Sequence, residues 1–242
     1  MILILALIQV TIFLLVFHRP LKKRPNIFYG IAVAMVIFLC ADGLLQISAD
    51  WPEWIRDYIL STLRRGSFST ALFIVVMFIG ALDTKRKSVR SLMKMRAELS
   101  IFASIFTFGH NLMYGYSYFP MLFTHPWDME PQYVAAAIVT LILLILLIPL
   151  FITSLPKVRR KMAPRKWKRL QCLAYPFYIL IYVHVLILFI PRLGLGSNYT
   201  VGVIAYTVIY ISYVILRLRK YINAGQREGV VIPNSYHTNS IS

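Results

Sequence analysis

The chain has 242 residues, of which 59% are hydrophobic and 14% charged, and its 26 Lys and Arg against 9 Asp and Glu give a formal net charge of +17. Soluble domains usually carry about 25% charged residues, so a water-soluble globule is excluded, and the apolar content also excludes a disordered chain. A charge this high indicates either nucleic-acid binding or the basic cytoplasmic loops of a membrane protein. The positions of the charges decide between the two.

The apolar residues form seven continuous runs, which predict an all-α, polytopic transmembrane bundle of about seven helices. A membrane span needs about 20 apolar residues, whereas strands of a transmembrane barrel would be shorter and would alternate. The runs cover residues 1–17, 27–47, 68–82, 99–119, 133–154, 171–191 and 200–216. The amphipathic segment 51–65 is expected to lie in the outer membrane interface.

The basic residues lie in every second loop. Of the 26 Lys and Arg residues, 22 lie in segments 18–26, 84–98 and 155–170 and in the region after residue 216. Cytoplasmic loops are enriched in Lys and Arg, so we expect a multi-pass protein of the cell membrane with its N-terminus outside and its C-terminus in the cytoplasm. The net charge therefore indicates orientation, and no nucleic acid is expected as a partner.

Ionisable side chains inside a span are costly and are candidates for function. His110 lies 13 residues after Ala97, where the helix of the fourth run is expected to begin, and His184 lies 13 residues after Gln171. At 1.5 Å per residue, both imidazoles lie about 20 Å from the cytoplasmic face. Two imidazoles at one level on parallel helices suit axial ligation of a haem. The other interpretation is two unrelated histidines, each hydrogen-bonded to a neighbouring helix.

Asp42 is a third candidate, near the outer end of the second run. Its carboxyl group would serve proton or quinol chemistry, or it would be a hydrated carboxylate at the interface.

Two regions carry a resemblance to a known family. Segment 160–175, followed by His184, resembles the ferric reductase-like transmembrane family, and is closest to the haem-binding membrane subunit of the bacterial methionine sulfoxide reductase system. The residues that fit are Trp167, Leu170, Tyr175 and His184. Segment 96–99 through His110 resembles the second haem helix of the family, and the likeness covers about residues 66–216. It implies N-terminal helices and the interfacial segment over 1–65, a haem-binding core over 66–220 and a polar, disordered cytoplasmic tail over 221–242.

The chain departs from the family at the inner haem site. The first histidine of the family pattern is Gln171 here, and the corresponding place on the fourth run offers Ala97 and Glu98. Family members with two haems use an inner and an outer histidine pair, and this chain keeps the outer pair. The resemblance therefore implies one b-type haem, with iron held by His110 and His184. Gln171 is not assigned as a ligand, because an amide oxygen binds low-spin haem iron poorly.

The expected function is that of a membrane electron-transfer subunit of an oxidoreductase. Electrons would come from a membrane quinol or from a flavin, FMN, in the inner half, and would pass to an extracytoplasmic reductase or flavoprotein. That partner is expected near loops 124–132 and 192–199, where His125, Pro126 and Trp127 would help to dock it. One alternative is a haem-free multi-pass transporter or scaffold. Another is a direct transmembrane metal reductase, which needs a flavin and nicotinamide domain that these residues do not contain.

Overall fold

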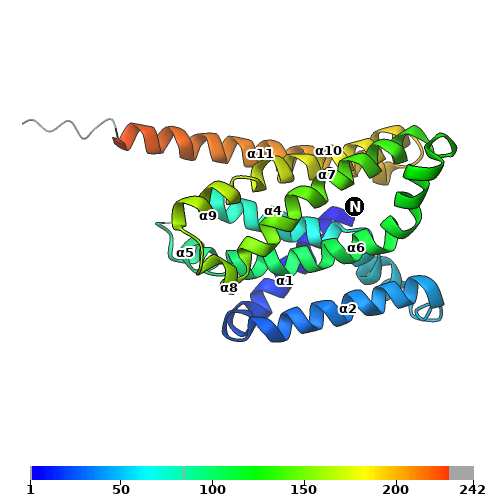
Figure 1. Ribbon diagram of the computed structural model, residues 1–242, viewed down its shortest axis with the longest axis horizontal. Coiled ribbons are helices and arrows are strands. Elements are labelled where there is room, and N and C mark those ends of the chain that lie inside the picture. Colours follow the sequence, from blue (N-terminus) through cyan, green and yellow to red (C-terminus); the bar gives the residue numbers. More distant parts are fainter. Residues whose placement is uncertain (1, 84, 229–242) are drawn as a thin grey trace, which may run out of the picture.

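The computed structural model describes residues 2–83 and 85–228, and every regular element in this part of the chain is a helix (Figure 1). The long helices are α1 (Ile2–Lys23), α2 (Pro25–Leu45), α4 (Ser67–Ala81), α6 (Arg96–Thr124), α7 (Pro131–Ser154), α10 (Ala174–Phe189) and α11 (Ser197–Glu228). The short ones are η1 (Ile55–Leu60), α3 (Ser61–Arg64), α5 (Lys87–Met93), η2 (Pro126–Asp128), α8 (Pro156–Arg159), α9 (Pro164–Gln171) and η3 (Ile190–Arg192). Each apolar run corresponds to one long helix, so the predicted helical bundle is confirmed.

Five helices in the described part of the chain are long and apolar enough to cross a membrane. They are α1, α2, α7, α11 and the nearly continuous stretch Pro164–Arg192. The pair Ile55–Arg64 and Ser67–Ala81 passes the same test as one broken span, bent by 62°. The chain is therefore built as a multi-pass membrane protein, and the third predicted span is the second half of that bent pair.

Helix α6 is long but less apolar than these spans. It packs against α2, α4 and α7, and its polar residues include Ser104, whose side chain is fully buried. The hydroxyl groups of Ser104 and Thr107 donate to carbonyl oxygens one turn earlier in the same helix, at 2.8 and 3.0 Å. The first half of α6 is buried among other helices, so it can carry polar groups that would be costly against lipid.

Proline residues mark several helix starts. Helices α2, α7, α8 and α9 each have proline in the first turn, where the missing amide hydrogen costs no helical bond. Helix α11 continues past the predicted end at residue 216 to Glu228. The first part of the segment expected to be a disordered tail is thus helical, because its Arg, Leu and Lys residues favour helix. Residues 229–242 of that tail lie outside the described residues.

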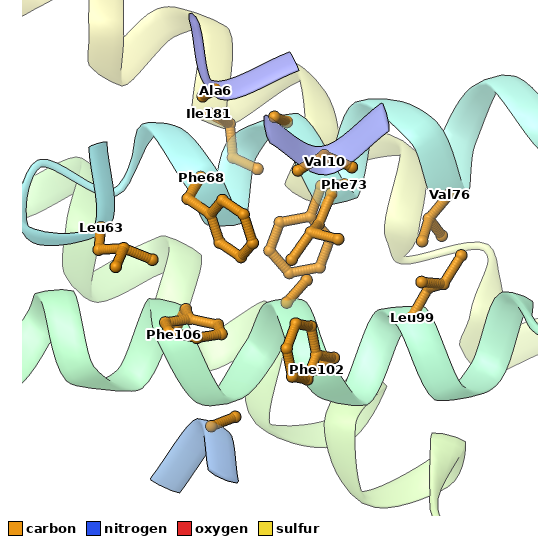
Figure 2. Packing of buried hydrophobic residues seen from close by; sticks show 14 of the residues in the cluster. Ala6, Val10, Leu63, Phe68, Phe73, Val76, Leu99, Phe102, Phe106 and Ile181 are labelled. Carbon is orange, nitrogen blue, oxygen red and sulfur yellow. The ribbon is translucent and has the colours of Figure 1, made fainter. Parts of the chain in front are cut away.

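The apolar core lies where α1, α4 and α6 meet (Figure 2). Phe102 of α6 stacks on Phe13 of α1 with ring centroids 5.1 Å apart. Phe68 of α4 contacts Phe106 of α6 edge to face at 5.2 Å. Helix α4 is buried along most of its length, because α1, α6 and α11 surround it. The site described below is built at one end of this helix.

The basic segments gather at the other end of α4. Helices α5, α8 and α9 and the C-terminal end of α11 lie there (Figure 1), and Lys220 Nζ donates to the carbonyl oxygens of Gly80 and Leu82 at 2.8 and 2.9 Å. Cations near a helix C-terminus satisfy its last carbonyl groups. We call this the basic end. The fold thus brings to one end of the molecule the basic residues that the sequence distributes over every second loop.

Candidate functional site

His110 lies in the middle of α6 and contacts the break between α3 and α4. Its Nδ1 lies 2.8 Å from the carbonyl oxygen of Arg64. In an unbroken helix that carbonyl would accept the amide of Phe68, but the chain turns at Gly66 and no described amide bonds to it. A carbonyl can only accept, so Nδ1 of His110 carries the hydrogen. Nε2 is left with its lone pair.

Gly66 makes room for this imidazole. Its φ of +72° lies in the left-handed region, which favours glycine. A β-carbon added at Gly66 would lie 3.1 Å from Cγ of His110 and 3.2 Å from its Nδ1. The break between α3 and α4 therefore provides both the acceptor and the space for the ring.

A buried ion pair holds the residue that supplies this acceptor. The side chain of Arg64 pairs with Asp42 at the end of α2, and Asp42 is 2% exposed. Asp42 also accepts from the amide and the hydroxyl of Ser48, at 2.6 and 2.9 Å. Asp42 is thus a buried structural carboxylate. The expectation of a hydrated interfacial aspartate is wrong, because Arg64 comes from a segment that the sequence does not place beside it.

His184 lies on α10 and contacts α7. Its Nδ1 is 3.3 Å from Oγ1 of Thr140, and that hydroxyl donates its hydrogen to the carbonyl oxygen of Ala136 at 2.8 Å. The hydroxyl therefore accepts from the histidine, and Nδ1 of His184 carries the ring hydrogen. Both imidazoles use Nδ1 for a hydrogen bond, and no partner for either Nε2 occurs in the described part of the chain.

The two histidines lie on helices that run in the same direction along α7. Helices α6 and α10 both pack along α7. Tyr118 and Phe108 of α6 contact Tyr133 and Phe151 of α7, so α6 runs antiparallel to α7 with His110 between these contacts. Arg192, just after α10, contacts Tyr133 near the start of α7, and Gln171, just before α10, contacts Thr153 near the end of α7. Helix α10 is therefore antiparallel to α7 as well. Helices α6 and α10 are therefore parallel to each other, as predicted.

Aromatic rings fill the bundle between the histidines and the basic end. Phe73 of α4 and Phe177 of α10 meet edge to face at 5.0 Å. Both rings are buried, as are Phe102 and Phe106 of α6 (Figure 2). On the other side of His110, Tyr114 lies 4.8 Å away between ring centroids. The candidate site is thus separated from the basic end by tightly packed phenyl groups.

The residues at the expected inner haem level have other contacts. The amide nitrogen of Gln171 donates to Oγ1 of Thr153 at 3.0 Å, beside the bond from Trp167 to the carbonyl oxygen of Thr153. Oε2 of Glu98 is buried without a hydrogen-bond partner among the described residues. In the described part of the chain, no group of three or more His, Cys, Asp or Glu side chains could hold a metal ion.

The donor set fits a haem with two axial imidazoles. Such a group needs one free nitrogen on each of two facing rings in apolar surroundings, and histidine ligands usually donate their other nitrogen to a carbonyl or hydroxyl oxygen. Nε2 of His110 and Nε2 of His184 are the free nitrogens here. A haem takes its other four iron ligands from its own macrocycle, so two protein ligands suffice.

Sequence reasoning did not find the residues that orient the two rings. Thr140 carries the one hydroxyl side chain between residues 133 and 153, and a hydroxyl in so apolar a run is a usable signal. Gly66 follows two arginines directly before an apolar run, which indicates a helix break. Nothing in the sequence connects Arg64 with Asp42 or with His110.

Comparisons with known proteins found a similar protein and a matching family model. An uncharacterized protein of Treponema pallidum (strain Nichols) is 34% identical over 226 residues, which is 93% of this chain and 61% of that protein. This chain therefore spans less than two thirds of that relative. No solved structure matches the chain. The sequence model of the family described as ferric reductase like transmembrane component matches residues 65–182, which include Gly66, His110 and Thr140. Residues 65–182 are therefore similar to the ferric reductase-like transmembrane family.

Proposed function

We propose that the chain is a haem b-containing membrane electron-transfer subunit, with His110 and His184 as the axial ligands of one haem. The observation that carries this proposal is the matched pair of imidazoles on parallel helices, each with Nδ1 bonded and Nε2 free. A haem with two histidine ligands would supply one-electron transfer.

The protein groups around the rings have separate tasks. The carbonyl oxygen of Arg64 and the hydroxyl of Thr140 select the ring tautomers, and they make each Nε2 a better donor to a metal. Gly66 gives the His110 ring its space. The apolar helices around the rings exclude water. This exclusion would protect a bound cofactor from side reactions with solvent.

Two observations support one haem per chain. Phe73 and Phe177 occupy the core between the level of the histidines and the basic end. Gln171, at the place of the family's inner histidine, is bonded to Thr153. The inner half of the core is therefore packed with side chains.

The direction of electron flow follows from the charges. We place the basic end in the cytoplasm because loops rich in Lys and Arg remain there, so the N-terminus lies outside and the C-terminus inside. A membrane quinol, or FMN bound at the basic end outside this packed core, would donate. The acceptor would be an extracytoplasmic reductase or flavoprotein at the opposite end, where Arg192 contacts the rings of Tyr133 and Tyr199 and Trp127 is 75% exposed.

The test is a dithionite-reduced minus oxidised spectrum of the purified protein, with haem quantified per chain. One haem is expected in the wild type, and at least a tenfold loss in His110→Ala and His184→Ala. His125→Ala is the matched control, because His125 is exposed in a loop, and it should retain the wild-type spectrum. An unchanged spectrum in both core variants contradicts the ligand assignment. A wild type without haem favours the transporter or scaffold.

A further inference from the structure

A small pocket at the basic end is lined almost entirely by cations. Its volume is about 180 Å³, and its lining residues are Lys22, Lys87, Arg90, Ser91 and Lys94. Lys22 lies at the end of α1 and the others on or beside α5. Two basic segments far apart in the sequence thus supply four positive charges to one place, and no carboxylate lines it. We call it the cationic pocket.

These charges are not balanced by acidic partners. No ion pair involving any of the four cations occurs among the described residues. Arg90 donates one hydrogen bond from Nη2 to the carbonyl oxygen of Lys85 at 3.0 Å, and its guanidinium has further N–H groups. Like charges this close repel one another, and an anion with several oxygens would relieve the repulsion while accepting from lysine, arginine and Ser91. Phosphate has that chemistry.

The surface of α1 leading to the pocket is apolar and exposed. Leu15 lies two turns before Lys22 on the same face of the helix and is 73% exposed. Ile12 and Ile8 continue this surface and are 56% and 52% exposed. Helix α1 is also one of the helices apolar enough to cross a membrane. The pocket therefore lies where a headgroup would be found if acyl chains lay along α1.

We propose that the cationic pocket binds the phosphate group of an anionic phospholipid whose acyl chains lie along α1. Basic pockets at the cytoplasmic side of membrane helices bind such headgroups. A soluble phosphate compound would use the cations but would gain nothing from the exposed leucine and isoleucine side chains. The site is distinct from the two histidines, so its occupancy does not depend on haem.

Native mass spectrometry of the detergent-purified full chain, titrated with phosphatidylglycerol, tests the proposal. The pocket variant removes three lining charges: Lys22→Gln, Arg90→Gln and Lys94→Gln. The matched control removes three exposed charges elsewhere at the basic end: Arg159→Gln, Lys161→Gln and Arg165→Gln. Each cation near an anionic lipid strengthens its binding, so the pocket variant, which lacks three of them, should bind at least about tenfold more weakly. The control should stay within about threefold of wild type.

Two further arms identify the source of the phosphate. Phosphatidylcholine should bind all three proteins alike, because its headgroup carries no net charge. Glycerol phosphate and FMN, which lack acyl chains, should not displace the bound phosphatidylglycerol. Displacement by either would overturn the lipid assignment in favour of a soluble phosphate ligand, and equal binding by the pocket and control variants would overturn the site.

A separate control checks that the variants fold as the wild type does. The three proteins should elute alike in size-exclusion chromatography, and Arg90→Gln alone should weaken binding in the same direction if the triple variant elutes differently. An Arg90→Gln protein that elutes as wild type and binds phosphatidylglycerol equally would also contradict the proposal.

Discussion

Among single residues, Gly66 makes the sharpest prediction. Gly66→Ala should lower the free energy of unfolding by about 1–2 kcal/mol, because an L-residue there must adopt left-handed backbone angles. It should also displace the His110 ring, whose Cγ would lie 3.1 Å from the new methyl group. Thermal unfolding in detergent and haem content per chain measure the two effects.

Gly194→Ala is the control for this experiment. Gly194 also has a positive φ, of +98°, but a β-carbon added there would meet nothing within 4 Å. This variant should show the backbone cost with normal haem content. If both alanine variants retain haem equally, Gly66 does not provide the space that we assign to it.

At the scale of the element, α10 and its partners decide the number of haem sites. Gln171→His restores the family's inner histidine, yet it should leave haem at one per chain. The opposite helix offers Ala97 and Glu98 instead of a histidine, and the Phe73 and Phe177 rings occupy the intervening core. Haem quantification of Gln171→His beside wild type measures this. A second haem would contradict this prediction, because the Phe73 and Phe177 rings would have to move apart to make room for it.

The elements differ in how far the sequence predicts them. Continuous apolar runs predict where each long helix lies, because lipid demands apolar surface over a fixed length, but they do not predict that α11 continues past residue 216 to Glu228. The parallel course of the helices that carry His110 and His184 follows from the alternation of basic loops. The pairing of Asp42 with Arg64 does not follow, because it depends on how α2 packs against the bent α3 and α4. The polar residues in the first half of α6 lie where that half is buried among other helices, which a single sequence cannot reveal.

For the whole molecule, the gathering of basic segments predicts orientation. A reporter that fluoresces only in the cytoplasm should be bright when fused after Ser242 and dark when fused before Met1. The physical reason is that Lys and Arg near helix ends resist transfer across the membrane. A fusion after Leu195, in the loop between α10 and α11, is the internal control and should be dark. A bright fusion at Leu195 with a dark one at Ser242 would reverse the proposed direction of electron flow.

The bent junction of α3 and α4 has a consequence for mutational tolerance. The group that accepts from His110 belongs to the main chain of Arg64, so no side-chain replacement at position 64 deletes it. In a saturation mutagenesis survey, substitutions of Arg64 would therefore act mainly by removing its ion pair with Asp42. The nearby Gly66 would tolerate few substitutions, because its φ is positive. The position that tolerates the fewest substitutions would then be Gly66, which has no side chain to donate or accept a hydrogen bond. A survey that ranks positions only by the reactive or polar groups of their side chains would overlook Gly66.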